Sequence, residues 1–462
     1  MKQFLGRKTF AFLCSGVLLA NMFFSAGASL HAQAFDPAIY RGRRDRLAAL
    51  AKEGIVVVQS IPENQKGVTE FFIEHSDNHD FIYLTGLDLK EGALLLLPKS
   101  SEYPEVLFVP RDQIPRAQAV SGVKTVLPAE NLDVLLSEAL TDVSLKRYTE
   151  RMKKPVSTEM ARILSLSAKK EFYLNYPRFL NLDAEPQSSV RLGEKLKDFS
   201  PDVEIRNATP LLTNLRVRHD KAEVEMIEKA VHVGSVGLIA AMKACKPGAY
   251  DYQIDALAES EFKNLGASGL AYPSLIYISP FGRKVQPLSA SELQSSSEPM
   301  SALHQMESGD FIMLDAGAEY QHYATDLSRM VPVSGKFSDE ERQSYEPVLA
   351  AHHAAIAEIR PGATFKQIND AAVRELKKRN LDQYFTFGTS HFIGMDGHDP
   401  GNYDEPLEPG MILTVEPGFI ESDKNIVVHV EDMVLVTDQG HRILSESVPI
   451  EIADVEKLLS QR

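Results

Sequence analysis

The sequence predicts an α+β protein with two domains, and three observations support this fold class. The chain has 462 residues, whereas a single hydrophobic core stops growing at roughly 250–300 residues. Short apolar runs alternate with amphipathic runs as far as about residue 205, a pattern typical of an α/β layer domain. Beyond residue 214 two related stretches follow one another, which indicates a second domain with an internal repeat.

The first 34 residues have the order of a secretory signal. Lys2, Arg7 and Lys8 give a basic start, and an apolar stretch from Phe10 to Phe24 precedes small residues and an AQA site. We expect cleavage after Ala34 and export of the mature chain to the periplasm or the medium. The alternative is an uncleaved membrane anchor, for which this apolar stretch is shorter than the ~20 residues of a span.

Charge and cysteine content restrict the partners of the mature chain. The formal net charge is −15 for the full chain and becomes −18 when Lys2, Arg7 and Lys8 leave with the signal, so a nucleic-acid backbone and an anionic membrane would both repel the mature chain. We therefore predict no nucleic-acid partner, and no membrane contact after signal cleavage. Cys14 would leave with the signal, so Cys245 would be the one remaining thiol and no internal disulfide could form.

The first domain, residues 35–205, begins with the amphipathic stretch YRGRRDRLAALAKEG and the apolar strand IVVVQS. Further strand-like runs are FIYLTG, GALLLLP, VLFVP and KTVLP, and helical stretches such as LDVLLSEAL alternate with them. The polar cluster HSDNHD (75–80) could line a ligand site, but we interpret it as a solvated loop. The sequence alone assigns no chemistry to this domain.

The second domain, residues 214–462, begins with a helix and contains the repeat. Asp220 and Glu223 have the spacing of a capping box ahead of a periodic apolar run. KPGAYDYQIDALAESEFK (246–263) and RPGATFKQINDAAVRELK (360–377) share their PGA start and a Gln-Ile pair, neither of which amphipathicity requires. We expect two related halves, each with a helix pair and a sheet segment, and a site that draws residues from both halves.

Two aspartates of this domain lie in a hairpin-like run, FIMLDAGAEYQHYATDLSRMVPV (311–333). A turn at residues 320–321 would make Asp315 and Asp326 a directly opposed pair, with Cβ atoms ~4.5–5.5 Å apart. Because like charges in such a pair repel each other, we expect a cation between them. Two exposed aspartates on a hairpin are the alternative.

Two glutamates occur in the last strand-like runs. MILTVEPGF (411–419) places Glu416 at the end of an apolar strand, and NIVVHVEDMVLVT (425–437) places Glu431 in the middle of another, on the same face as His429. A carboxylate among valines is costly to bury unless it is paired or bound to a metal. No Lys or Arg lies between Glu431 and Arg442. A metal site is therefore favoured over a salt bridge, whose cation would come from elsewhere in the chain.

The stretch FGTSHFIGMDGHDPG (387–401) adds His391 and His398 to the candidate site residues. Four carboxylates and one imidazole suit two hard or borderline divalent ions, such as Mn²⁺, Co²⁺, Zn²⁺ or Fe²⁺. Two such ions ~3.5–4 Å apart can polarise a carbonyl and hold a bridging water deprotonated near neutral pH. This pattern predicts a metal-dependent hydrolase.

In order and spacing, these motifs resemble the pita-bread metallopeptidases, the family of aminopeptidase P, prolidase and methionine aminopeptidase. The motifs are the paired aspartates, SHxxGxxxH, TVEPG and a glutamate followed by aspartate at an apolar strand. The segment DNHDFIYLTGLDLKEGALLLLP resembles the N-terminal domain of the aminopeptidase P, prolidase and creatinase branch. Creatinase, the metal-free relative, is disfavoured because all five ligand positions are filled. The resemblance implies a C-terminal pita-bread catalytic domain with a pseudo-twofold repeat, behind an N-terminal creatinase/prolidase-like α/β domain.

The resemblance also implies a ligand set. Asp315 would bind one metal, His391 and Glu416 the other, and Asp326 and Glu431 would bridge the two. The cofactors implied are two divalent ions, with Mn²⁺ preferred and Co²⁺, Zn²⁺ or Fe²⁺ as alternatives. A hydroxide bridging the ions would attack the carbonyl of the first residue in an Xaa-Pro bond.

Three further positions complete the implied catalytic group or depart from it. Glu416 would handle the proton of the attacking water, and His398 would contact substrate and stabilise the tetrahedral intermediate. The family has a histidine where this chain has Phe387, and an arginine where it has His429. Another family histidine lies shortly before the hairpin, where His304 is the candidate, with altered spacing.

The function implied is an exported Xaa-Pro aminopeptidase acting on oligopeptides. One alternative is an Xaa-Pro dipeptidase, or prolidase. Another is a catalytically weak peptide-binding protein, because Phe387 and His429 depart from the family's pattern. The predicted partners are a proline-containing peptide and further copies of the chain in a homo-oligomer.

Overall fold

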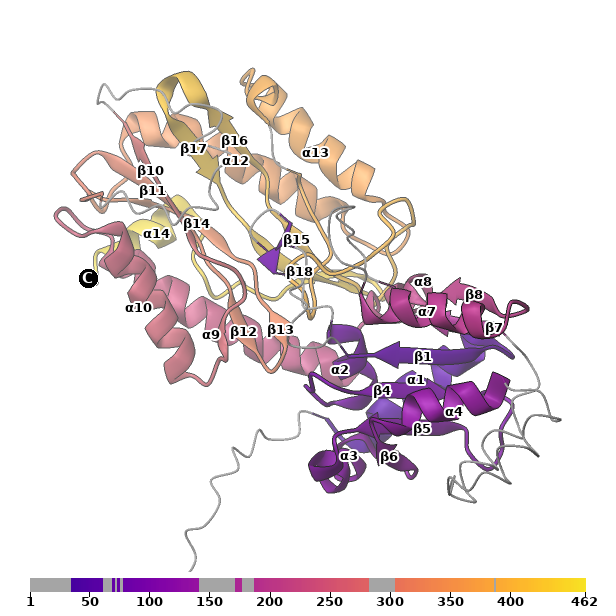
Figure 1. Cartoon of the computed structure of the whole chain (residues 1–462). Coiled ribbons are helices and arrows are strands. Elements are labelled where there is room, and N and C mark those ends of the chain that lie inside the picture. The colour runs from indigo at the N-terminus through magenta and orange to yellow at the C-terminus, as the bar shows by residue number, and fades with distance from the viewer. Residues whose placement is uncertain are drawn as a thin grey trace, which may run out of the picture. The chain divides into compact units, whose positions relative to one another are not determined.

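The computed structural model in Figure 1 describes residues 35–60, 69–70, 73–74, 78–140, 171–176, 187–281, 304–385 and 388–462. The predicted signal, residues 1–34, and Phe387 lie outside these ranges. None of the described helices is both long and apolar enough to cross a membrane. Both parts of the described chain mix helices with sheets, as the predicted α+β class requires. The domain limits 35–205 and 214–462 stay a prediction.

The first domain is built on a mixed sheet. Among the described residues its strands are, in spatial order, β6 (Val126–Pro128), β5 (Glu105–Val109), β4 (Ala93–Leu96), β1 (Ile55–Gln59), β7 (Glu171–Leu174) and β8 (Glu204–Asn207). β4 is antiparallel to both β1 and β5, whereas β5–β6, β1–β7 and β7–β8 are parallel pairs. Apolar side chains such as Val57, Leu95 and Phe172 form its core. The short strands β2 (Thr69–Glu70) and β3 (Ile73–Glu74) pair separately.

The described helices of this domain are α1 (Pro37–Ala51), α2 (His79–Thr85), α3 (Ile114–Ser121) with the preceding turn η1 (Arg111–Gln113), α4 (Asn131–Leu140) and α7 (Ser188–Phe199). The helix α8 (Thr209–Arg216) follows at the boundary between the two predicted domains. The prediction of a strand at FIYLTG was wrong, because this run lies in α2, which ends at Gly86 with a φ of +71°. All the residues of α2 are buried. A short, fully buried apolar run does not distinguish a strand from a helix by its periodicity.

Two helix pairs form the internal repeat of the second domain: α9 (Lys221–Ala244) with α10 (Asp251–Asn264), and α12 (Asp339–Glu358) with α13 (Phe365–Lys377). In each pair a glycine at positive φ, Gly248 or Gly362, turns the chain between the helices. Gln253 and Gln367 each accept a hydrogen bond from the backbone N–H of the residue that precedes the second helix, at 3.1 and 2.9 Å. The shared glutamine therefore has the same capping function in both halves.

Each half also contributes antiparallel strands. One sheet consists of β10 (Leu275–Pro280), β11 (Asp310–Asp315) and β14 (Ser328–Pro332), and the other of β15 (Ile412–Val415), β18 (Asp432–Thr437) and β19 (Gly440–Ile443). Two smaller sheets are present among the described residues. One consists of β9 (Gly269–Leu270), β12 (Ala318–Tyr320) and β13 (Tyr323–Ala324), and the other of β16 (Gly418–Glu421) and β17 (Ile426–His429). The remaining elements are the turns η2 (Asp382–Tyr384) and η3 (Ser422–Lys424) and the last helix, α14 (Ile452–Leu459). α9 packs against β11 and β12, and α12 packs against β15 and β17 (Figure 1).

The hairpin turn lies one residue later than predicted. Tyr320 pairs with Tyr323, and the turn residues Gln321 and His322 have φ values of +52° and +66°, as a two-residue type I′ turn requires. Asp315 is therefore opposite Ser328, and not opposite Asp326 as predicted. This change moves the cross-strand partner by two residues, so the same faces stay together.

Among the described residues, an isolated backbone bridge joins the sheet of β10, β11 and β14 to the start of β18 in the sheet of the other half. Ser328 N–H donates to Glu431 O at 3.4 Å, and Glu431 N–H donates to Ser328 O at 3.0 Å. Because Ser328 is also the partner of Asp315 across β11 and β14, this bridge brings the first aspartate of one half to the last glutamate of the other. The predicted junction between the halves is thus where the carboxylates gather.

Candidate metal centre

Strand ends position all four predicted carboxylates. Asp315 is the last residue of β11, Asp326 lies two residues before β14, Glu416 directly follows β15 and Glu431 directly precedes β18. A strand end gives a side chain a fixed backbone while leaving one side of it open to a ligand. The β-sheets of both halves therefore supply carboxylates to one place.

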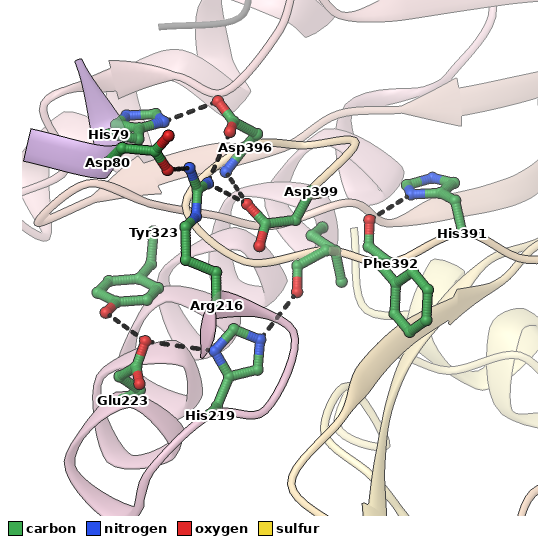
Figure 2. A network of polar contacts seen from close by, with 11 residues as sticks. His79, Asp80, Arg216, His219, Glu223, Tyr323, His391, Phe392, Asp396 and Asp399 are labelled. Atoms are coloured by element: carbon green, nitrogen blue, oxygen red, sulfur yellow. Dashed lines mark hydrogen bonds and ion pairs between the residues drawn. The ribbon is translucent and has the colours of Figure 1, made fainter. Parts of the chain in front are cut away.

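His391 is fixed beside β15 by its own backbone. Its N–H donates to Thr414 Oγ1 at 3.1 Å, and its carbonyl accepts from Thr414 N–H at 2.9 Å. Its ring Nδ1 lies 3.0 Å from the carbonyl oxygen of Phe392 (Figure 2). A carbonyl can only accept, so Nδ1 carries the hydrogen and Nε2 is directed to the carboxylates. Metal-binding histidines almost always have this arrangement.

Two overlapping groups of donor atoms result. In one group Asp326, His391 and Glu431 have ligand atoms within 4.8 Å of one another, and in the other Asp315, His429 and Glu431 do. His391 Nε2 also lies 3.3 Å from Glu416 Oε1. The structure thus brings all five predicted ligands together, and adds His429 to them.

The electrostatics of this cluster call for a cation. Burial, followed by repulsion from Asp326, raises the pKa of both Asp315 and Glu431 well above the usual value. Burial raises the pKa of Glu416 to about 7, although His391 opposes this. Burial alone would lower the pKa of His391, but Glu416 and Asp326 raise it to about 9. One imidazole does not balance four carboxylates, whereas two divalent cations would.

The salt-bridge alternative does not account for Glu431. Arg329 is buried nearby, but it donates to the backbone carbonyl of Glu431 and, at 2.6 Å, to the carboxylate of Asp432. Arg442 pairs with Glu228 instead. Glu431 is 1 % exposed, and its Oε1 has no hydrogen-bond partner among the described residues. A buried carboxylate oxygen of this kind is costly unless a ligand satisfies it.

Sequence reasoning missed Tyr272, which lies shortly before β10 and is buried. Its hydroxyl lies 2.6 Å from Asp315 Oδ1 and also hydrogen-bonds Asp326 Oδ1. Burial, followed by repulsion from the two aspartates, raises the pKa of Tyr272 well above 10, so the phenol keeps its proton. Tyr272 therefore sets the position of both aspartates. Only its tertiary contacts distinguish it from the other tyrosines of the chain.

We expect Tyr272→Phe to weaken metal binding by ~10–100-fold, as the loss of a hydrogen bond to a metal ligand typically does. The measurement is the dissociation constant of Co²⁺ or Mn²⁺, determined by competition with a chelator. The matched control is Tyr277→Phe, because Tyr277 is also partly buried but donates to Asn425, outside the cluster. Equal metal affinity in the two variants would contradict the role given to Tyr272.

The other predicted catalytic residues are placed differently. The ring centroid of His398 lies 4.0 Å from that of His391, and the His398 side chain is exposed, as a substrate-facing group would be. His304 is exposed, and its Nδ1 lies 3.9 Å from Asp251 at the start of α10. Its contacts in the described part of the chain are therefore not with the carboxylate cluster. Phe387 lies outside the described residues.

A buried ion network holds the loop that carries the two histidines (Figure 2). Arg216, at the end of α8, lies 2.8 Å from Asp80 and 2.7 Å from Asp396, and it also pairs with Asp399. His79 Nδ1 lies 2.7 Å from Asp396 Oδ1. The interpretation of HSDNHD as a solvated loop was therefore wrong for its described end: residues 78–80 are buried, and α2 contacts the loop of residues 391–401.

A second buried network surrounds Glu223, the N3 residue of the predicted capping box, which the structure confirms. Arg43 lies 3.2 Å from Glu223 Oε2, and Tyr323 donates to Glu223 Oε1 at 3.0 Å. His219 Nδ1 lies 3.4 Å from the same Oε1 (Figure 2). Burial alone would raise the pKa of Glu223, but Arg43, with His219, lowers it to about 2.

The lowered pKa of Glu223 predicts that the free energy of unfolding falls at acidic pH. A carboxylate with a lowered folded-state pKa stabilises the fold above its ordinary pKa of 4.5, and loses this contribution as the pH falls from 4.5 towards 2. We expect the difference in the free energy of unfolding between wild type and Glu223→Gln to shrink by roughly 3 kcal/mol between pH 6 and pH 2. Urea unfolding at several pH values measures this difference. A difference that does not change with pH would contradict the assignment.

Comparison with known proteins identifies the family. Residues 225–438 match metallopeptidase family M24, and residues 40–147 match the aminopeptidase P N-terminal domain. The chain belongs to the M24, or pita-bread, metallopeptidases. The resemblance seen in the motifs is thereby confirmed, including the branch with the additional N-terminal domain.

Similar proteins match this metallopeptidase along most of its length. The Xaa-Pro aminopeptidase of Haemophilus influenzae is 29% identical, over 82% of this chain and 87% of its own length. The Xaa-Pro dipeptidase of Pyrococcus furiosus is 27% identical, over 65% of this chain and 84% of its own. The solved structure of Pseudomonas aeruginosa aminopeptidase PepP covers 93% of this chain and 99% of its own, with 25% identity and a TM-score of 0.73. The chain is a metallo-aminopeptidase.

The residues of the cluster fit the divalent metals that a metallopeptidase needs. Carboxylate oxygen and imidazole nitrogen are ligands that Mn²⁺, Co²⁺, Zn²⁺ and Fe²⁺ all accept. Glu431 belongs to both donor groups, and its buried Oε1 has no hydrogen-bond partner among the described residues. Burial and mutual repulsion raise the pKa values of Asp315 and Glu431 well above the usual value, and a bound cation would offset both effects.

Proposed function

We propose that this metallopeptidase is an exported Xaa-Pro aminopeptidase, which removes the first residue of a peptide when proline follows it. The observation that carries the proposal is the carboxylate and imidazole cluster at the junction of the two halves, in a chain that also has the aminopeptidase P N-terminal domain. The name of the Haemophilus influenzae relative, which matches most of both chains, supports the same substrate class.

The proposed centre holds two divalent ions, for which Mn²⁺ is our first candidate. Asp315 and Glu431 would contribute to one position, and His391 and Glu416 to the other, with Asp326 and Glu431 between the two. Bound there, the ions would supply the polarisation of the scissile carbonyl and the acidification of water that amide hydrolysis needs. The support for this assignment is that Glu431 belongs to both donor groups and that His391 Nε2 lies near both Asp326 and Glu416.

Two residues of the chain would handle protons and charge. Glu416 is partly exposed at the edge of the cluster, so its carboxylate can hold the proton taken from water and release it to the leaving amine. His398 is exposed beside His391, where its ring can donate to an oxygen that gains negative charge during attack. Proline requires a dedicated enzyme because its nitrogen has no hydrogen to donate and its φ is fixed.

Export and self-association are further parts of the proposal. The basic, apolar and small-residue order of residues 1–34 supports export. A homo-oligomer is proposed from the family resemblance, and the mass in solution by light scattering tests it.

The deciding experiment compares substrates. The mature chain is loaded with Mn²⁺, Co²⁺ or Zn²⁺ and incubated with Xaa-Pro dipeptides, Xaa-Pro-Xaa peptides and Xaa-Ala peptides of the same length. We expect release of the first residue from the Xaa-Pro-Xaa peptides, and little from the alanine series, because the site is proposed to require proline at the second position.

The possible results distinguish the proposed Xaa-Pro aminopeptidase from the two alternative functions, the dipeptidase and the peptide-binding protein. Cleavage of dipeptides alone would replace the proposal with an Xaa-Pro dipeptidase. Peptide binding by calorimetry without turnover, with every metal, would favour the catalytically weak binding protein. Equal release of the first residue from the Xaa-Pro-Xaa peptides and from the Xaa-Ala controls would show an aminopeptidase of a different specificity.

A further inference from the structure

We propose that His429 is a metal ligand, so that each of the two donor groups contains one imidazole. His391 would serve the group of Asp326 and Glu431, and His429 the group of Asp315 and Glu431. This inference rests on the metal centre of the proposed function and deepens it. It concerns a position where the sequence departs from its family, which has arginine there.

Strand pairing places the His429 ring against the cluster. His429 is the last residue of β17 and pairs with Gly418 of β16, which follows Glu416 by two residues. A Cβ atom added to Gly418 would lie only 2.8 Å from His429 Nδ1. Glycine at position 418 therefore leaves the space that the ring occupies. The side chain is 3 % exposed, so the ring lies within the cluster rather than at its rim.

The distances suit a shared ion better than a hydrogen bond. His429 Nε2 lies 3.9 Å from Glu416 Oε2 and 3.9 Å from Glu431 Oε2. This spacing exceeds the ~2.7–3.2 Å of a hydrogen bond. Two ligands that are each ~2.0–2.2 Å from one ion can lie up to ~4.3 Å apart. The corresponding distances from His391 Nε2, 3.3 Å to Glu416 and 3.6 Å to Asp326, also fall within this limit.

Glu431 provides an independent indication of a ligand. It is the residue common to both donor groups, and its Oε1 is buried without a hydrogen-bond partner among the described residues. An arginine at position 429 would supply a fixed positive charge beside this carboxylate. Neutral histidine offers one N–H donor and one lone pair. Because Nε2 is 3.9 Å from Glu431 Oε2, too far for a direct hydrogen bond, we assign the Nε2 lone pair to a cation between the two groups.

A second imidazole should alter which metals bind. Imidazole favours Co²⁺, Zn²⁺ and Fe²⁺, whereas carboxylate and water ligands suit Mn²⁺ and Mg²⁺. We therefore infer that His429 raises the affinity for Co²⁺ and Zn²⁺ relative to Mn²⁺ at the position that Asp315 shares. Removing the imidazole should reduce this preference.

The test measures metal binding by the full mature chain, without reference to activity. His429→Phe keeps the ring size and removes the donor, and His429→Gln keeps a polar group. The readouts are the number of Co²⁺ ions per chain by elemental analysis, the dissociation constants by chelator competition and the visible absorption spectrum of bound Co²⁺. His391→Phe is the parallel change in the other group, and His441→Phe removes an exposed histidine of β19 outside both groups.

We expect both His429 variants to bind one of two Co²⁺ ions ~100-fold more weakly or worse, since losing even a hydrogen-bond partner of a ligand costs ~10–100-fold. The Co²⁺ spectrum should change, and Mn²⁺ affinity should fall less. His441→Phe should match wild type. Variants that fold, by circular dichroism, with unchanged Co²⁺ affinity and spectrum would overturn the inference alone. A wild-type chain that binds no Co²⁺, Zn²⁺ or Mn²⁺ would instead refute the proposed metal centre.

Discussion

Asp326→Ala should lower kcat/KM for an Xaa-Pro-Xaa peptide on the order of 1,000-fold. The Asp326 carboxylate belongs to the donor group of His391 and Glu431, and Tyr272 holds it in place. Loss of a carboxylate between two metal positions removes several kcal/mol of transition-state stabilisation, and each ~1.4 kcal/mol is a factor of ten in rate. Steady-state kinetics with saturating metal, and elemental analysis of the same samples, provide the measurement.

The fold of this variant should persist. Asp326 repels Asp315, Glu431 and Glu416 in the metal-free cluster, but its carboxylate also pairs with His391 and hydrogen-bonds Tyr272. Because the relieved repulsion and the lost contacts oppose each other, we expect the metal-free variant to melt near the wild-type temperature. Asp438→Ala, in the exposed turn between β18 and β19, is the matched control and should keep full activity. Asp326→Ala with activity within tenfold of wild type would exclude this residue from the metal centre.

Arg216→Ala should destabilise the protein by ~3–5 kcal/mol, the usual cost of removing one partner from a buried ion pair. The Arg216 side chain is 2 % exposed and pairs with Asp80, Asp396 and Asp399. Its removal leaves three buried carboxylates close together without the guanidinium that all three share, although His79 still pairs with Asp396. Urea unfolding at pH 7 gives the change in the free energy of unfolding directly.

Arg218→Ala is the matched control, two residues along the chain. Arg218 pairs with Glu408 at the surface, where their side chains are 30 % and 50 % exposed, and surface pairs contribute only ~0–1 kcal/mol. Both variants remove an arginine from an ion pair, so the difference between their free energies of unfolding measures the effect of burying that pair. Equal losses of stability in the two variants would show that the Arg216 network does not support the fold.

The sequence was enough to name the five ligand candidates. The four carboxylates lie beside strands whose apolar pattern is plain, whereas His391 lies in a glycine-rich stretch, and the roles of all five came from the family resemblance. The hairpin register could not be predicted to the residue. A type I′ turn normally favours Asn or Gly at its positive-φ positions, and this chain has Gln321 and His322 there. The wrong register did not place the aspartates on different faces. It moved the cross-strand partner of Asp315 from Asp326 to Ser328, two residues along, and residues two apart in a strand point to the same face of the sheet.

Three residues of the site could not be predicted from the sequence, and the reason is the same for all three. Tyr272, His79 and Arg216 act through partners that are far away along the chain, such as Asp396, which lies 317 residues after His79. Local periodicity carries no information on such contacts. A tyrosine ahead of a strand, or a polar cluster near a turn, has the same local pattern whether it is solvated or buried. The α2 helix was mistaken for a strand for a similar reason, since complete burial removes the period.

The ion network that connects α2 with the loop of residues 391–401 restricts how domains from related proteins can be combined. Asp80 comes from one domain, Asp396 and Asp399 come from the other, and Arg216 joins them near the boundary. A chimaera that takes its two domains from different relatives would inherit this ion cluster, to which His79 also belongs, in pieces. Residues 79, 80, 216, 396 and 399 therefore form a unit of exchange, and domains from different parents are compatible only when these positions come from one of them.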